Sequence, residues 1–194
     1  RLRRIIDHYG ADPQLVCSTA TIGNPATHSE TVTGASFTVV DKDGSPRGRR
    51  DIVFWQPPVE EAEPDEAVSE TERGPAPRRA ATEEAAGVAA HLGLNGVQTL
   101  TFARSRQETE VGVKQAIGAA RAHPGDGYLD IEPYHAGLSK RKRRATENEL
   151  KGGALDAVIS TSALELGIDI GSVDATILAG YPGTRQSFWQ QIGR

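Results

Sequence analysis

The second half of the chain alternates short apolar runs with longer segments whose apolar residues recur at helical spacing. The short runs predict buried strands and the longer segments predict helices. Alternation of this kind is typical of βαβ units around a parallel sheet, so we expect an α/β fold. The predicted strands are 96–102, 128–133, 155–160 and 174–179, and the predicted helices are 82–92, 105–122, 139–151, 162–166 and 184–192.

The first half has a less regular pattern. Residues 1–10 predict a helix that stops at Gly10, and Thr82 is the expected N-cap of the helix over 82–92. Cys17 falls inside a short apolar run, so we expect an inert thiol in the core. Further strands are predicted over 13–19, 36–40 and 51–55.

The composition excludes several classes of protein. No apolar run approaches the roughly 18 residues of a membrane helix, so we expect no membrane partner. The single Cys excludes a disulfide framework and a Cys-rich zinc site within these residues, and we expect no metal ligands and an intracellular location. The chain opens at Arg1 without Met, in a pattern like the middle of a helix, which indicates a fragment of a longer protein.

The net charge of −4 combines two opposite poles. Residues 59–72 hold seven acidic residues and no basic one, while the rest of the chain is net basic. A stretch with this many acidic residues cannot bury enough apolar surface to become ordered. We therefore predict a flexible insertion over 58–80. The opposite pole, Lys140–Arg144, consists of five consecutive bases, which fits either a solvated helix start or contact with phosphates.

Small polar residues and glycines gather in the loops after the predicted strands, and in a parallel sheet these loops share the edge where ligands bind. Each loop also has an ordinary interpretation: Ser105 and Ser139 as helix caps, His135 as a satisfied surface histidine, and Gly167 as a helix end. The sequence has no G-x-x-x-x-G-K-[ST] phosphate loop and no acidic pair placed to bind magnesium.

The order of five segments is more specific than any one of them. They resemble motifs III, IV, IVa, V and VI of superfamily 2 DEAD/DEAH-box helicases. Further segments, 20–25, 181–184 and 189–191, resemble RecQ-related DNA-repair helicases that carry a C-terminal zinc-binding domain. The five motif segments are, in order, 19–25 (TATIGNP), 101–106 (TFARSR), 134–138 (YHAGL), 160–170 (STSALELGIDI) and 190–194 (QQIGR).

The resemblance implies a RecA-like parallel sheet flanked by helices. Residues 1–25 would be the tail of a first RecA-like domain, and residues 26–57 a connector with entry strands. After the insertion, residues 81–194 would be the second RecA-like domain, cut within motif VI. The P-loop and acidic box would then lie upstream in the first domain, which would also hold most of the Mg²⁺ contacts.

The resemblance also implies roles at an ATP cleft. Arg194 would reach the γ-phosphate as a catalytic arginine, together with Gln190 of the same motif. Gly167 and Asp169 would lie beside the sugar and phosphates of ATP. Motif III would couple the ATP state to domain closure, through Thr19, Ala20 and Thr21.

Nucleic acid would lie across the loops of both domains, as single-stranded or partly duplex DNA. Small hydroxyls and backbone amides suit phosphates and read no base sequence. The implied partners are this DNA and the first RecA-like domain of the same parent chain, and the implied location is cytoplasmic and nucleoid-associated. The implied contact residues are Ser105, Arg106, His135, Gly137 and Thr161.

The leading prediction is the C-terminal motor half of an ATP-dependent DNA helicase or translocase. One alternative is a nucleic-acid-binding or remodelling module whose ATPase has decayed, and another is an RNA helicase. A third is an unrelated α/β enzyme, which would need a catalytic constellation of its own.

Overall fold

The computed structural model describes residues 1–19, 22–42, 44, 46, 48–59, 78–124, 127–171 and 173–194. The chain divides into two compact units, residues 1–53 and 54–194. The domain boundaries expected from the sequence stay predictions. None of the helices in the described part of the chain combines the length and apolarity needed to cross a bilayer.

The first unit contains two short helices, α1 (Leu2–Tyr9) and α2 (Pro25–Thr33). The helix predicted over 1–10 is confirmed, and Gly10 ends it at φ 62°, in the left-handed region that glycine tolerates. Helix α2 was not predicted; it begins with proline at its first position and ends at Gly34. No described residue of this unit is buried.

The three strands predicted over 13–19, 36–40 and 51–55 are wrong. The described residues of these ranges carry no strand hydrogen bonding, because no neighbouring strand completes a ladder with them. Cys17 is exposed, so its expected place in a core is also wrong. An apolar run shows that a segment can be buried, but burial requires a partner that the described part of this unit does not supply.

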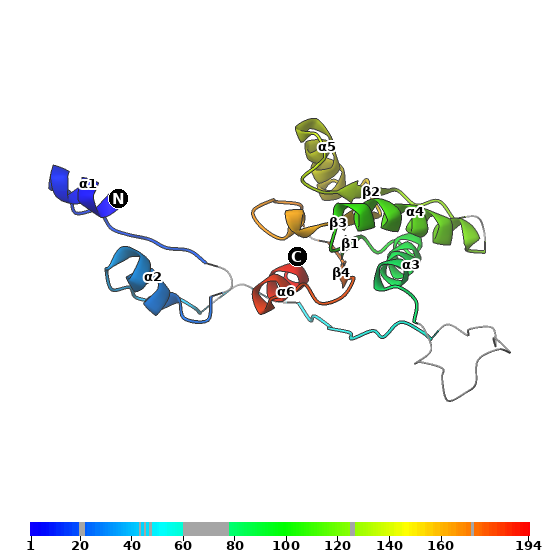
Figure 1. Ribbon diagram of the computed structural model, residues 1–194, viewed down its shortest axis with the longest axis horizontal. Helices are drawn as coiled ribbons and strands as arrows, with labels where there is room; N and C mark the ends of the chain where they lie inside the picture. The colour runs from blue at the N-terminus through cyan, green and yellow to red at the C-terminus, as the bar shows by residue number, and fades with distance from the viewer. Residues whose placement is uncertain are drawn as a thin grey trace, which may run out of the picture. The chain divides into compact units, whose positions relative to one another are not determined.

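The second unit is built on a four-stranded parallel sheet in the order β2-β3-β1-β4, with helices packed on it (Figure 1). The α/β prediction is therefore confirmed. Residues 162–166, predicted as a helix, form only a 3₁₀ turn over Ser162–Leu164. In chain order the elements are α3 (Ala81–Leu94), β1 (Thr99–Phe102), α4 (Arg106–Ala122), β2 (Ile131–Tyr134), α5 (Lys140–Lys151), β3 (Ala157–Ser160), β4 (Ala175–Leu178) and α6 (Arg185–Ile192).

Two apolar clusters cover the two faces of the sheet. On one face, small residues of α3 and α4 pack against Ile159, and a Cβ at Gly112 would sit 3.0 Å from the Cδ1 atom of that side chain. On the other face, Leu150 of α5 packs with Val158 and with the loop after β3. Because neighbouring residues of β3 point to opposite faces, this strand anchors both clusters.

The N-cap of helix α3 is Ala80, which makes no side-chain hydrogen bond, so the prediction that Thr82 is the cap is wrong. The Thr82 hydroxyl instead lies 3.5 Å from Glu108 Oε2 of α4. Upstream, Val59 and Arg78 form an isolated antiparallel bridge. Residues 60–77, which make up most of the predicted flexible insertion, lie outside the described residues.

Candidate functional site

The loops predicted to carry the chemistry meet at one edge of the sheet. Strand pairing aligns Phe102 with both Ser160 and Leu178, and Tyr134 with Ser160, so the four strands end side by side. Ser105, Gly137 and Thr161 follow three of these strand ends, as expected for residues at the carboxyl edge of a parallel sheet.

The two predicted hydroxyls both cap local turns. Ser105 Oγ accepts the N–H of Glu108 at 3.1 Å and thereby caps α4. Thr161 Oγ1 accepts the N–H of Ala163 at 3.4 Å, at the start of the 3₁₀ turn. A hydroxyl that accepts one hydrogen bond still has its own O–H to donate, so the capping role leaves each of them able to contact a phosphate.

His135 and Gly137 form a closed loop after β2. The N–H of Gly137 donates to His135 Nδ1 at 3.1 Å, so the ring proton lies on Nε2, which is 3.0 Å from Glu110 Oε1. His135 is only 8% exposed, and both its nitrogens face protein atoms. A Cβ at Gly137 would sit 3.2 Å from Arg106 Nη1, so the exposed Arg106 guanidinium lies directly beside this loop.

Arg194 is anchored on the loop that follows β3. Its Nη1 donates to the carbonyl of Ile168 at 2.9 Å and its Nε donates to the carbonyl of Glu165 at 3.2 Å. These are two of the five N–H donors of a guanidinium. Motifs V and VI, expected from the sequence to share a site, are therefore in direct contact.

A buried pair that the sequence did not predict reinforces this contact. Gln191 Nε2 donates to Glu165 Oε2 at 2.9 Å, and both side chains are buried. Glu165 thus accepts from Gln191 through its carboxylate and from Arg194 through its carbonyl. Gln190, the residue that was predicted, is half-buried.

Gly167 and Asp169 lie on the same loop. Gly167 has φ 74°, a conformation that other residues rarely adopt, and the space where its Cβ would point is open. The Asp169 carboxylate is exposed and forms an ion pair with Lys151 of α5. The hydrogen bond from Lys151, and then the one from the N–H of Gly171, lower the pKa of Asp169.

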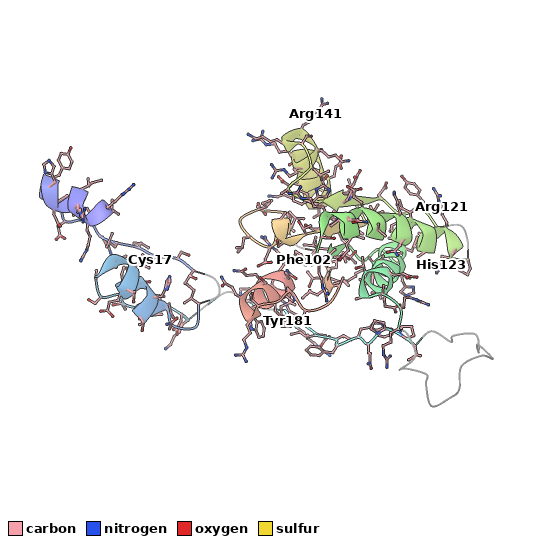
Figure 2. The ribbon with its side chains drawn as sticks, viewed as in Figure 1. Cys17, Phe102, Arg121, His123, Arg141 and Tyr181 are labelled. Carbon is pink, nitrogen blue, oxygen red and sulfur yellow. The ribbon has the colours of Figure 1, made fainter. Side chains whose placement is uncertain are left out.

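The basic run Lys140–Arg144 forms the start of α5, capped by Ser139, whose Oγ accepts the N–H of Lys142 at 3.2 Å. Lys142 is half-buried and pairs with Glu132 at 2.7 Å, so this base supports the sheet. Figure 2 shows Arg141 projecting outward from α5. The exposed bases of this run are Lys140, Arg141 and Arg144.

The buried Tyr134 of β2 belongs to the apolar cluster that also contains Leu150 of α5. Its hydroxyl donates to Glu147 Oε1 at 2.5 Å, and burial together with this bond raises its pKa to about 12. Tyr134 therefore stays neutral near pH 7 and ties β2 to α5.

Three predicted site residues do not belong to the second unit. Thr19 is exposed and belongs to the first unit, while Ala20 and Thr21 lie outside the described residues. Among the described residues, no three His, Cys, Asp or Glu side chains cluster as a metal site would require.

The chain is similar to proteins named as helicases. A family model described as the helicase conserved C-terminal domain matches residues 86–194. The uncharacterized ATP-dependent helicase YprA of Bacillus subtilis is 38% identical over 194 residues, covering 100% of this chain and 24% of that protein. The ATP-dependent helicase HRQ1 of Saccharomyces cerevisiae is 35% identical over 186 residues, covering 93% of this chain and 16% of that protein.

The fold is similar to that of a solved helicase structure. The DUF1998 helicase MrfA bound to DNA and AMPPNP is 37% identical, with a TM-score of 0.82 over 99% of this chain and 25% of that one. The chain thus spans about a quarter or less of the length of these relatives. The expected RecA-like fold and the resemblance to superfamily 2 helicases are confirmed: this chain belongs to the helicase conserved C-terminal domain family.

Proposed function

We propose that this chain is the C-terminal motor half of an ATP-dependent DNA helicase or translocase. The observation that carries the proposal is the anchoring of Arg194 on the loop that also holds Gly167, at the edge where Ser105 and Thr161 lie. The Arg194 guanidinium is thereby fixed on the loop of Gly167, at the same edge as loops whose hydroxyls can bind phosphates. Family membership and the names of the relatives agree with this reading.

The residues at this edge fit the phosphate end of ATP. The two anchoring hydrogen bonds leave further N–H donors of Arg194 for an anion, and the open face of Gly167 allows close approach of the backbone. A fixed guanidinium stabilises the charge that develops on a transferring phosphoryl group. Arg194 would supply this stabilisation, with Gln190 and Asp169 beside it.

Mg²⁺ and the rest of the ATP site would come mainly from a first RecA-like domain, because this sequence contains no P-loop. Residues 1–25 would be the tail of that domain, with Thr19, Ala20 and Thr21 coupling the ATP state to domain closure. We propose a cytoplasmic, nucleoid-associated location for the parent protein.

Nucleic acid would bind along the carboxyl edge through its phosphates. Ser105 and Thr161 offer hydroxyls and Arg106 offers a charge, all without sequence preference. His135 would act by holding the Gly137 loop in place, since both its nitrogens are used internally. We propose DNA as the substrate because the solved relative MrfA is described as bound to DNA.

The proposal is tested by measuring ATP turnover of the full-length parent with and without single-stranded DNA. We expect DNA-stimulated turnover, and Arg194→Ala should lower it by about 10³-fold or more, as losing an arginine at the transition state does. Arg121→Ala, at the far end of α4, is the matched control and should leave turnover unchanged. Turnover that survives Arg194→Ala would overturn the placement of the ATP site, and no turnover in the wild type would favour a binding module.

A further inference from the structure

The residues after β4 gather three aromatic rings on the surface beside α6. Tyr181 and Trp189 are 58% and 57% exposed, and Phe188 is half-buried. The Phe188 ring centroid lies 6.4 Å from that of Tyr181 and 5.6 Å from that of Trp189. Figure 2 shows Tyr181 next to α6. We refer to these three residues as the aromatic cluster.

The rings of the aromatic cluster are not stacked on one another. Phe188 meets Trp189 at an interplanar angle of 76°, edge to face, and its ring is tilted by 32° from that of Tyr181. Neither exposed ring is therefore covered by a parallel neighbour within the cluster. Large aromatic surface left in water at one place marks an interaction site, for a protein surface or for a ligand with flat apolar faces.

Two arginines accompany the segment that carries the cluster. Residues 180–189, which carry the cluster, contain Arg185 and no acidic residue. Arg104, from the loop after β1, lies against the backbone of Gly180, because a Cβ there would sit only 3.3 Å from Arg104 Cζ and would collide with its Nη2. Arg104 is exposed, so its guanidinium lies beside Gly180, the residue that precedes Tyr181.

The aromatic cluster begins at the carboxyl edge of the sheet, because Tyr181 follows the end of β4. Strand β4 pairs in parallel with β1, so Gly180 and Tyr181 leave the sheet beside the loop that carries Arg104 and Ser105. A strand of nucleic acid whose phosphates follow this edge would bring its bases within reach of the rings. Grooves that bind single strands combine these two features, basic contacts for phosphates and aromatic side chains for bases.

We propose that the aromatic cluster and Arg104 form a stacking site for unpaired nucleic-acid bases. Tyr181 and Trp189 supply the stacking surfaces, Phe188 supports both rings, and Arg104 contacts a neighbouring phosphate. Since every base has a π-face, the site tolerates any sequence. This site deepens the proposed function and rests on it. A protein surface is the competing occupant, and the exposed Arg104 guanidinium against Gly180 favours nucleic acid.

The test compares two single strands that share a phosphate backbone but differ in bases. Binding of the 194-residue chain to oligo(dT) and to an abasic strand of equal length is measured by fluorescence anisotropy at one salt concentration. We expect tighter binding of oligo(dT). Tyr181→Ala and Trp189→Ala should each weaken oligo(dT) binding by about 5- to 100-fold, the range for losing one stacked base, and leave abasic binding within about twofold.

Two matched variants control this comparison. Tyr128 is 79% exposed and precedes the amino end of β2, away from the carboxyl edge, so Tyr128→Ala should leave the affinity for both oligonucleotides unchanged. Trp189→Phe keeps an aromatic face and should retain most of the oligo(dT) affinity. Thermal melting by circular dichroism confirms that each variant is folded.

A spectroscopic readout on an unmutated cluster is independent of these variants. The chain has two tryptophans, so Trp55→Phe leaves Trp189 as the single indole. Oligo(dT) should quench its fluorescence by stacking, and the abasic strand should not.

The outcomes separate the stacking site from the proposed function. Equal binding of both strands by the wild type, or oligo(dT) binding unaffected by Tyr181→Ala and Trp189→Ala, overturns the stacking site alone and assigns the cluster to a protein partner. Absence of binding to either strand overturns the stacking site together with the nucleic-acid face of the proposed function.

Discussion

A single buried residue, Glu165, connects the loop after β3 with the end of α6. Its carboxylate accepts from Gln191 and its carbonyl accepts from Arg194, so one residue fixes both the last turn of α6 and the guanidinium. A carboxylate removed from water requires hydrogen-bond donors, and the Gln191 amide supplies one. We therefore expect the position of Arg194 to depend on the Gln191 amide.

Replacing Gln191 with alanine should destabilise the protein. The substitution leaves the buried Glu165 carboxylate without this donor, so we expect the free energy of unfolding to fall by about 1–3 kcal/mol. Urea denaturation measures the change. Gln186→Ala, at an exposed position of the same helix, is the control and should stay within about 0.5 kcal/mol of wild type. Equal effects of the two substitutions would contradict the role of the buried pair.

The sequence could not distinguish Gln191 from Gln190. These residues precede Arg194 by three and four positions, and both spacings place side chains on the same side of a helix. Only the docking of α6 on the loop after β3 decides which amide is buried. In contrast, Arg194 could be predicted as a site residue, because its place in the segment 190–194 identifies it without knowledge of how α6 packs.

At the scale of elements, the second unit was predictable because its strands and helices alternate with distinct hydrophobic periods. Ser105 and Ser139 cap helices, as one of the two interpretations of each residue held, and Thr184 caps α6 as well. Helix α2 was missed because its hydroxyl and β-branched residues favour other conformations, and two threonines bond back to carbonyls four residues earlier. Its only sequence signals were the proline at its start and Gly34 after its end.

Substitutions at Ser105 should separate its role as a helix cap from its proposed phosphate contact. Ser105→Ala removes the acceptor for the Glu108 N–H and should cost about 1 kcal/mol of unfolding free energy. Ser105→Asp keeps a good cap, and its charge suits a helix N-terminus, but the carboxylate would repel phosphates. We therefore expect Ser105→Asp to be stable in urea denaturation and to bind single strands more weakly than Ser105→Ala. The reverse order of affinities would show that Ser105 does not face nucleic acid.

At the scale of the whole chain, the charges are separated along the sequence. Acidic residues concentrate in 59–72, while Lys140, Arg141 and Arg144 are exposed in the first turns of α5. Helix α5 begins just after the loop that holds His135 and Gly137, so these bases start at the carboxyl edge. The net charge of −4 therefore describes the molecule poorly, and a polyanion would meet a locally basic edge.

The salt dependence of single-strand binding measures how many of these bases meet phosphates. For single strands the slope of log K against log[salt] is roughly −0.7 per neutralised phosphate, so replacing Lys140, Arg141 and Arg144 with alanine should make it shallower by about 2. Arg121 is exposed at the opposite end of α4 (Figure 2), and Arg121→Ala should leave the slope unchanged. An unchanged slope in the triple variant would mean that these three side chains face water and do not contact phosphates. A change shared equally with Arg121→Ala would mean that the chain attracts nucleic acid by its general charge, without a defined path along the carboxyl edge.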